Sequence, residues 1–351
     1  MTAINISGII YNHCIALHKR YYKLFGKSLD TYALQKHITK LKKLKKYGFW
    51  NRVGSQSIQD ITQRIDRAYK LFFRNRKQNI RSAPPSFKKV RKYKSFTLKQ
   101  AGYKLLADNR IIILGQEYKF HKSRDIEGTV KTLTVKRDTL GDIYIYLVCK
   151  QESNQVVART GKSVGFDFGL KKFLVSSDGS DIEAPMFFKQ NADAIKTANR
   201  RLSRKKKGSN NRKRAKLELV RLHKKVANQR KDYHFKLSRS ICEQYATVCI
   251  EDLNIKAMQR IWGRKISDLG HSQFVDILKH QASKVGTNVV EIPRFYPSSK
   301  TCSCCAYVLD ELPLSARAWV CPACGVEHDR DRNAANNILK VGASTLQGEV
   351  V

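Results

Sequence analysis

The chain has 351 residues, a length that allows two or three domains with hydrophobic cores of their own. It carries 68 Lys and Arg against 29 Asp and Glu, and its formal net charge at pH 7 is +39. This excess predicts a polyanionic partner bound largely through phosphate contacts, although a solvated basic surface or a ribosome-associated protein would share it. No apolar run approaches the length that spans a membrane, so we expect no membrane partner.

The nine cysteines are unevenly distributed, because five of them lie between Cys302 and Cys324, counting both ends. No secretory signal peptide is recognisable at the start of the chain. A metal site in a reducing compartment therefore explains these cysteines better than a disulfide framework does, and we expect a cytoplasmic protein.

Residues 5–73 show a helical pattern. Within residues 55–73 the apolar side chains recur at steps of three and four, and Ser57 with Asp60 has the spacing of a capping box at a helix start. The pattern stops at Pro84 and Pro85, because proline interrupts regular structure.

Residues 95–150 change to short runs rich in β-branched and aromatic residues, which are typical of strands. The runs cover residues 110–114, 117–121, 130–136 and 143–149. The turn at Leu140, Gly141 and Asp142 joins the last two runs as a hairpin. This pattern predicts a small β-barrel or sandwich.

A mixed α/β pattern begins at residue 162. Strands are expected at residues 164–168, 172–176, 181–186, 246–250 and 288–292, with a long polar helical stretch after the third strand and a helix at residues 272–285. A final helix is expected at residues 331–340, followed by a disordered tail after Gly342. A three-stranded meander followed by alternating helices and strands is the order of the ribonuclease H type of fold.

Three acidic residues that are far apart in the sequence are expected to meet in this fold. Asp167 and Glu251 lie at the edges of predicted strands, and Asp331 opens the final helix. Singly each is more often structural, but together they are typical of a two-metal site that cleaves phosphodiesters, and hard oxygen ligands suit Mg²⁺ or Mn²⁺. Gly169, just past the first acid, would let the backbone and a metal-bound phosphate approach closely.

Two neighbouring acids complicate this assignment. Asp252 follows Glu251, and adjacent strand residues point to opposite faces, so we assign Glu251 to the metals and expect Asp252 to cap the next segment. Asp329 and Asp331 are two residues apart and do not share a helix face. One of them is a ligand and the other caps the helix or pairs with an arginine, and the spacing does not choose between them.

The cysteines near the C-terminus form the sharpest local motif. Cys302 and Cys305 make one C-x-x-C pair, Cys321 and Cys324 make another, and about fifteen residues separate the pairs. This spacing predicts a four-cysteine zinc ribbon with a closed tetrahedral structural site. A disulfide arrangement is the alternative, and Cys304 is expected to take no part.

Residues 200–239 are strongly basic, with 17 Lys and Arg against two acids. They predict a helical pair whose loop, around residues 208–211, lies near the acidic site. Phosphate contact is favoured over a solvated helix face or a nuclear-localisation-like run. The predicted nucleic-acid-binding residues are Arg200, Arg201, Arg204, Lys205, Lys206, Lys207, Arg212, Lys213 and Arg214.

Several of these motifs together resemble one known family. They are VGFDFGLKKFLVSSDG, RRLSRKKKGSNNRKRAK, CIEDLNIKAM, FYPSSKTCSCC, WVCPACG and HDRDRNAANNIL. Between about residue 56 and residue 339 the chain resembles the TnpB family, the OrfB-type proteins of bacterial and archaeal insertion sequences, which are related to the type V CRISPR effector nucleases.

The resemblance implies an organisation and an activity. It implies a helical recognition lobe over residues 1–90, a small β-barrel wedge domain over 91–160, and a ribonuclease H-like, RuvC-like nuclease domain over 161–351 with a zinc ribbon inserted at about 298–327. The implied activity is RNA-guided, metal-dependent cleavage of DNA beside a short recognition motif. The resemblance gives Asp167, Glu251 and Asp331 the positions of the catalytic acids, and it makes the four cysteines the zinc ligands.

The implied cofactors are two Mg²⁺ or Mn²⁺ ions, one structural Zn²⁺ and a guide RNA. The implied partners are the guide RNA, target double-stranded DNA and the RNA–DNA heteroduplex, with sequence read by base pairing. The expected location is a bacterial or archaeal cytoplasm, in association with the nucleoid, and the choice between monomer and dimer is left open.

Two other functions compete with this one. A guide-dependent DNA-binding repressor should have lost at least one acid, and all three are present. A strand-transferring transposase of the same fold would itself recognise transposon ends.

The chain departs from the family pattern at two places. Family members usually begin with a further strand, whereas helix-like sequence here starts almost at Met1, and Ala306 replaces a glycine after the second zinc cysteine, where positive φ is often needed.

Overall fold

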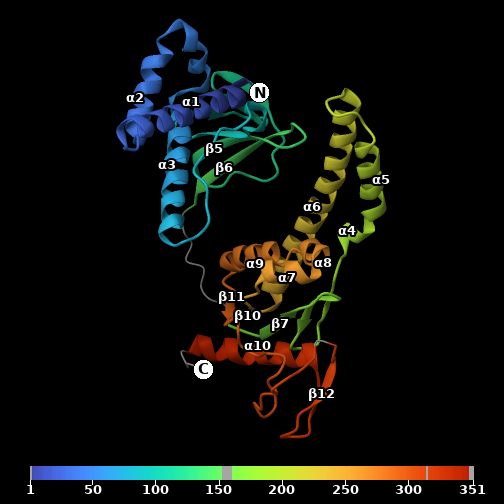
Figure 1. Cartoon of the computed structure of the whole chain (residues 1–351). Helices are drawn as coiled ribbons and strands as arrows, with labels where there is room; N and C mark the ends of the chain where they lie inside the picture. The colour runs from blue at the N-terminus through green and yellow to red at the C-terminus, as the bar shows by residue number, and fades with distance from the viewer. Residues whose placement is uncertain (1, 152–159, 314, 348–351) are drawn as a thin grey trace. The chain divides into compact units, whose positions relative to one another are not determined.

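The computed structural model describes residues 2–151, 160–313 and 315–347, and the chain divides into two compact units, Met1–Glu152 and Ser153–Val351 (Figure 1). In the described part of the chain, no helix combines the length and the apolar character needed to cross a membrane.

The first unit begins with helices, as the sequence predicts. They are α1 (Thr2–Phe25), α2 (Thr31–Lys42), the 3₁₀ helix η1 (Lys45–Val53), α3 (Ser55–Lys77) and the short η2 (Val90–Lys92). The predicted capping box is wrong, because α3 already starts at Ser55, behind Gly54. Ser57 and Asp60 lie buried inside the helix, and Asp60 forms a 2.7 Å ion pair with Arg64.

The strands of the first unit form two three-stranded antiparallel sheets. One has the order β1 (Ser95–Leu98), β5 (Thr129–Arg137), β6 (Ile143–Lys150), and the other β2 (Tyr103–Leu105), β3 (Arg110–Ile113), β4 (Gln116–Lys119). The hairpin predicted between β5 and β6 is confirmed. Helices and strands share one hydrophobic core that includes Ile10, Trp50, Ile61, Leu98 and Leu133. The barrel closure and the division near residue 90 remain predictions.

The second unit is built on a five-stranded sheet. Its order is β11 (Asn288–Ile292), β10 (Thr247–Glu251), β7 (Ser163–Phe168), β8 (Lys172–Ser176), β9 (Ile182–Glu183). Strands β7, β8 and β9 pair antiparallel, while β10 pairs parallel with both β7 and β11. The predicted three-stranded meander followed by alternating helices and strands is therefore confirmed, with a third strand shorter than expected.

Helices lie on both faces of this sheet (Figure 1). Side chains of α6 (Asn210–Gln244) and α9 (His271–Val285) share a core with Val164, Phe166 and Phe168 of β7. The opposite face packs against α10 (Arg330–Gln347), where Ile338 and Val341 meet Cys249. The remaining helices are α4 (Phe187–Gln190), α5 (Ala192–Ser203), α7 (Ile255–Trp262) and α8 (Arg264–Leu269).

Helix α10 extends further than the sequence predicts. It continues to Gln347, so the expectation of disorder directly after Gly342 is wrong, while residues 348–351 lie outside the described part. Val341, in the last turns of the helix, is buried in the core that α10 shares with the sheet. Gly342 also sits so close to β10 that an added Cβ would lie 2.3 Å from the sulfur of Cys249.

The backbone of α10 rests directly on β7 at Gly165. A Cβ added at Gly165 would lie 2.2 Å from the carbonyl oxygen of Ala335 and 2.7 Å from the amide nitrogen of Leu339. These are backbone atoms that cannot swing away as a side chain can, so only glycine permits this spacing. The contact fixes the distance between the sheet and the helix that carries Asp331.

Replacing Gly165 with alanine should therefore push α10 away from the sheet. We expect Gly165→Ala to lower the free energy of unfolding by about 1–3 kcal/mol, the usual cost of overpacking. Chemical denaturation measures this change. Gly48→Ala is the control, because an added Cβ there has no neighbour within 4 Å and should change stability little. Wild-type stability of Gly165→Ala would contradict the account.

Candidate functional site

The three acids predicted from the sequence converge at one place on the second unit. Alternation along β7 and β10 puts Gly165, Asp167, Cys249 and Glu251 on the face that α10 covers. Gly165 pairs with Cys249 and Phe166 with Ile250, so Asp167 and Glu251 follow on adjacent parallel strands. Asp331 lies in the first turn of α10.

The pKa of Asp167 shows that its carboxyl group lies within electrostatic range of Glu251 and Asp331. Burial raises the pKa of Asp167 to about 8, and repulsion from Glu251 and Asp331 adds to this effect, while Arg330 opposes it. Burial also raises the pKa of Glu251, against a hydrogen bond from Ser298 that lowers it. Such a group of like charges is costly without a cation, and clusters of this kind mark functional sites.

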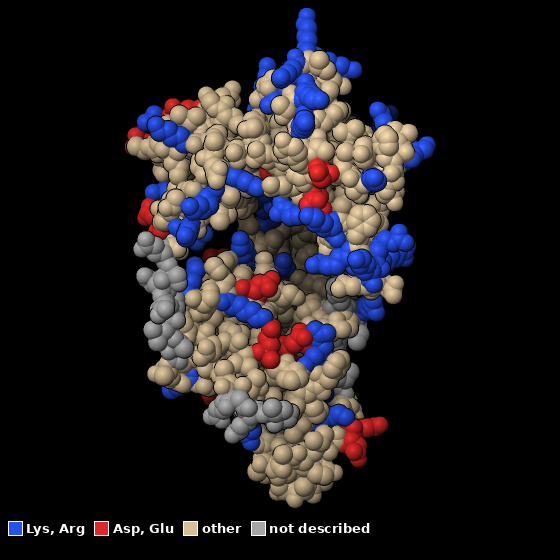
Figure 2. Space-filling view, turned by 90° about the vertical axis from the view of Figure 1, so that its left-hand side faces the viewer, with Lys and Arg blue, Asp and Glu red and all other residues tan. Residues whose placement is uncertain are grey.

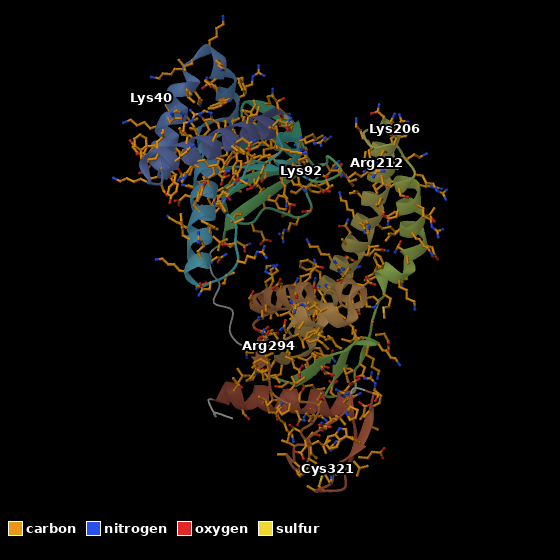
Figure 3. All side chains as sticks on the ribbon, viewed as in Figure 1. Lys40, Lys92, Lys206, Arg212, Arg294 and Cys321 are labelled. Carbon is orange, nitrogen blue, oxygen red and sulfur yellow. The ribbon has the colours of Figure 1, made fainter. Side chains whose placement is uncertain are left out.

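The neighbouring acids take other roles. The prediction that Asp252 caps the following helix is wrong. The cap is Asn254, whose side chain accepts the hydrogen bond from the amide of Ala257. Asp252 instead forms a 2.7 Å ion pair with Arg294. Figure 3 labels Arg294 on this part of the unit.

Asp329 caps α10 through a 2.8 Å hydrogen bond that its Oδ1 accepts from the amide of Arg332. Asp331 is left to face the other two acids, with Arg317 Nη1 at 3.7 Å from its Oδ2. The expectation that one of these two aspartates caps the helix is confirmed.

Gly169 has a structural role in the turn, while the predicted close approach of a metal-bound phosphate stays a prediction. An added Cβ would lie 2.5 Å from the carbonyl oxygen of Lys172, and the Gly169 amide donates to the carbonyl of Phe173 at 3.4 Å. This glycine closes the tight turn between β7 and β8, so its small size serves the hairpin that carries Asp167.

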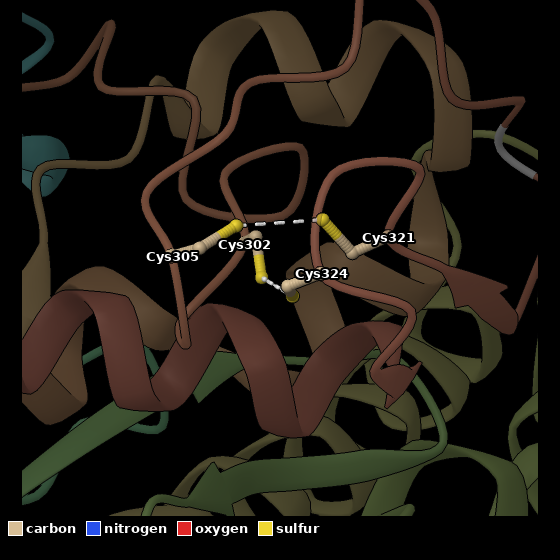
Figure 4. Close-up of side chains that lie close together, drawn as sticks. All are labelled: Cys302, Cys305, Cys321 and Cys324. Atoms are coloured by element: carbon tan, nitrogen blue, oxygen red, sulfur yellow. Dashed lines mark hydrogen bonds between the residues drawn. The ribbon is translucent and has the colours of Figure 1, made fainter.

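The four-cysteine motif forms a compact cluster (Figure 4). Within the described residues, it is the one group of potential metal-binding side chains whose ligand atoms all lie within 4.8 Å of one another. The sulfurs of Cys302 and Cys324 are 3.7 Å apart and those of Cys305 and Cys321 are 3.6 Å apart. Four sulfurs at about 2.3 Å from a tetrahedral zinc ion would be separated by about 3.8 Å, so the cluster fits zinc.

The disulfide alternative is not realised, since all nine cysteines lie in the described ranges and none of them is in a disulfide bond. The cluster follows β11 and contains the short hairpin of β12 (Ala318–Val320) and β13 (Glu327–Asp329). His328, which the sequence analysis missed, is buried with Nε2 at 3.0 Å from the sulfur of Cys302. A ring nitrogen there can support a metal-bound thiolate.

Ala306 adopts the left-handed backbone conformation that a glycine would favour. Its φ is +65°, and Gly325, which follows the second C-x-x-C pair, has a φ of +73°. The two turns are equivalent, but only the second has the residue suited to it, so the first turn is strained as expected.

Three residues of the site escaped the sequence analysis: Ser298, Asn333 and Asn337. The Ser298 hydroxyl donates to Glu251 Oε1, and both asparagine side chains donate to backbone carbonyls of the loop that holds Ser298. Their one sequence signal is the i, i+4 spacing of the asparagines, which places them on the same helix face.

The basic residues lie on a hairpin of α5 and α6. An open hollow of about 640 Å³ runs between these helices and is lined by Arg201, Lys205, Asn211, Arg214, Ala215, Glu218 and Arg221. Figure 2 shows Lys and Arg in many separate groups on one face and Asp and Glu in fewer groups. Three of the predicted contacts, Arg201, Lys205 and Arg214, line this hollow, and Arg201 forms a 3.1 Å ion pair with Glu218.

Arg212 has a structural role as well, because its Nη1 donates to the carbonyls of Leu202 at 2.7 Å and Lys205 at 2.9 Å and so ties down the end of α5. Lys213 bonds Asn210 at 3.0 Å. The other predicted contacts, Arg200, Arg204, Lys206 and Lys207, are exposed.

The loop of this hairpin is not near the acids, which corrects the prediction. Helix α6 is one continuous helix of 35 residues, about 50 Å long, and its far end leads into β10. Lys206 and Arg212 therefore lie at the tip, away from the sheet (Figure 3). The uninterrupted length of α6 places the loop at this distance from the acids.

Comparison with known proteins identifies the family. Residues 146–262 match the OrfB_IS605 family, described as "Probable transposase", and residues 271–338 match the Cas12f1-like TNB domain. The chain is 33% identical over 313 residues to a Streptomyces pristinaespiralis protein named "Putative RNA-guided DNA endonuclease", covering 87% of this chain and 76% of the relative. The chain belongs to the TnpB family.

Further relatives agree with this assignment. InsQ of Escherichia coli K12 is also named a putative RNA-guided DNA endonuclease. It is 31% identical over 317 residues, which cover 85% of this chain and 77% of InsQ. A TnpB-like protein of Acanthamoeba polyphaga mimivirus is 30% identical over 241 residues, covering 64% of this chain and 46% of the relative.

A solved structure shares the fold. It is the cryo-EM structure of a Cas12f1–sgRNA–target DNA complex, with a TM-score of 0.58 and 14% identity over 96% of the TnpB-family chain and 81% of the solved one.

The raised pKa of Asp167 predicts a pH-dependent stability. A carboxyl group whose pKa rises from 3.8 to about 8 on folding makes the metal-free protein less stable as pH increases between these values, by at most about 1.4 kcal/mol per pH unit. Asp167→Asn should remove this loss, and its melting temperature should exceed that of the wild type most clearly near pH 8. Asp252→Asn is the control. Parallel melting profiles of Asp167→Asn and wild type across pH would contradict the assignment.

The strained turn predicts a stabilising substitution. Ala306→Gly should stabilise the cysteine cluster by about 1 kcal/mol, because glycine adopts positive φ without steric cost. Zinc retention against a competing chelator measures the gain. Ala323→Gly, inside the second knuckle, is the control and should give no improvement; equal zinc retention by the two variants would count against strain at Ala306.

Proposed function

We propose that this protein is an RNA-guided, metal-dependent DNA endonuclease. The observation that carries the proposal is the convergence of Asp167, Glu251 and Asp331, with the pKa of the first raised by its burial and by the other two. The names of the relatives point to the same activity.

The donor set suits divalent cations with hard character. Three carboxylates offer oxygen atoms as ligands. Without a cation, burial and the neighbouring negative charges raise the pKa of Asp167 to about 8, so its protonated form is favoured at neutral pH. The carboxylate oxygens do not all lie within 4.8 Å of one another, so the side chains would have to draw together on binding. Mg²⁺ or Mn²⁺, two ions in this proposal, would supply charge stabilisation and an activated water for hydrolysis of the phosphodiester.

The residues of the chain have distinct roles in this reaction. Asp167 and Glu251, on adjacent strands of a rigid sheet, would hold the cations, and Asp331 would complete the set from α10. Arg330 and Arg317 offset part of the negative charge around them. The cysteine cluster would hold one Zn²⁺ and stabilise the segment between β11 and α10.

The remainder of the chain would bind nucleic acid. The net charge of +39 and the exposed hairpin of α5 and α6 support contacts to the backbone of a guide RNA, a double-stranded DNA target or their heteroduplex. Target sequence would be read by base pairing. The helices of the first unit would act as the recognition lobe, and its sheets would act as the wedge domain that reads the motif beside the target.

A strand-transferring transposase is the second candidate, favoured by the description of the family that matches residues 146–262. It would join donor ends to target DNA with no RNA present. Strand-transfer products in such a reaction would support it over guided cleavage.

Removal of one acid tests the proposed reaction. Asp167→Ala should reduce the rate of DNA cleavage by about 10³-fold or more, because the cations lose a ligand in the transition state, while RNA and DNA binding stay nearly unchanged. Single-turnover cleavage assays and filter binding measure the two effects. Asp252→Ala is the matched control and should keep most of the activity. Undiminished cutting by Asp167→Ala would refute the assignment.

A further inference from the structure

Glu251 receives a hydrogen bond from outside the three-acid set. Ser298, in the loop that links β11 to the cysteine cluster, donates from its hydroxyl to Glu251 Oε1. The serine is 7% exposed. A glutamate carboxyl group rotates over a broad range about its last torsion, so one directional hydrogen bond to one oxygen selects an orientation.

The loop that holds Ser298 is itself fixed to α10. Asn337 Nδ2 donates to the carbonyls of Ser298 at 2.8 Å and Thr301 at 2.6 Å. Asn333 Nδ2 donates to the same two carbonyls at 3.4 Å and 2.7 Å, and its Oδ1 accepts from the amide of Ser303 at 2.9 Å. Both asparagines are almost fully buried, where unpaired amide groups would be costly.

These hydrogen bonds connect α10, the loop that holds Ser298, and Glu251. Helix α10 carries both Asp331 and the asparagine pair, the pair holds the loop, and the loop holds Ser298 against Glu251. The position of Glu251 relative to Asp331 is therefore set by hydrogen bonds as well as by the sheet. The loop continues directly into Cys302, so the cysteine cluster anchors its other end.

We propose that Ser298 is a positioning residue, which orients the Glu251 carboxylate for cation binding, and that Asn333 and Asn337 hold Ser298 in place. This inference rests on the proposed function of the three acids. Ser298 touches neither substrate nor cation in this account and acts only through Glu251.

Mn²⁺ binding to the full chain, purified with its RNA, tests the inference without relying on activity. Ser298→Ala should weaken Mn²⁺ binding by about 10- to 100-fold, the usual effect of losing a partner that orients a ligand. Ser298→Thr keeps a hydroxyl and should bind within a few-fold of the wild type. Asn337→Ala should weaken binding as well, because it frees the loop. Electron paramagnetic resonance of free Mn²⁺ measures all four proteins.

Controls separate this role from a purely structural one. Ser299→Ala removes the neighbouring hydroxyl, leaves the hydrogen bond to Glu251 in place and should bind Mn²⁺ like the wild type. Zinc content and melting temperature should be the same for Ser298→Ala and Ser299→Ala. A loss of zinc or stability in Ser298→Ala that accompanies weaker Mn²⁺ binding would overturn the positioning role, as would unchanged Mn²⁺ binding.

Failure of the proposed function would look different. If the wild type bound no Mn²⁺, or if Asp167→Ala bound it equally well, the three-acid site itself would be refuted and this inference with it. If Asp167→Ala lost binding while Ser298→Ala kept it, only the role of Ser298 would be overturned.

Discussion

The backbone contact between α10 and β7 at Gly165 is the constraint on which the site depends. It brings the helix to the sheet more closely than any side chain would allow. Gly342 of α10 comes similarly close to the side chain of Cys249 on β10. Because Asp167 and Glu251 share the covered face of the sheet, the first turn of α10 meets them at its edge. The acids thus converge through packing, and their mutual repulsion has to be overcome by the buried contacts around them.

The loop with Ser298, α10 and the cysteine cluster together hold the three acids in place against their mutual repulsion. Burial and like charge hold a proton on Asp167 near neutral pH, a state that a divalent cation would replace. The loop between β11 and the cysteine cluster presses Ser298 against Glu251, and α10 holds that loop through two buried asparagines. In this view the cysteine cluster stabilises the geometry of a site to which it contributes no ligand.

The sequence predicted most of the strands and the cysteine cluster, because each depends on local pattern or spacing. It failed where a partner lies far away in the chain. Asp252 pairs with Arg294, 42 residues on, and no local pattern showed that Asn254 would take the cap. Ser298 lies 47 residues from Glu251. The loop of the basic hairpin was misplaced because α6 runs without interruption for 35 residues.

The central claim is that a bound RNA directs cleavage by the three acids, and reprogramming that RNA tests it most directly. The protein would be expressed with its native flanking locus, and the RNA that copurifies with it would be sequenced. The segment of this RNA that is encoded beyond the end of the insertion sequence would then be replaced by a new sequence. The account predicts that the cut moves to DNA matching the new segment, beside the same short motif. Cleavage that stays at the original sequence, or that ignores the RNA altogether, would contradict it.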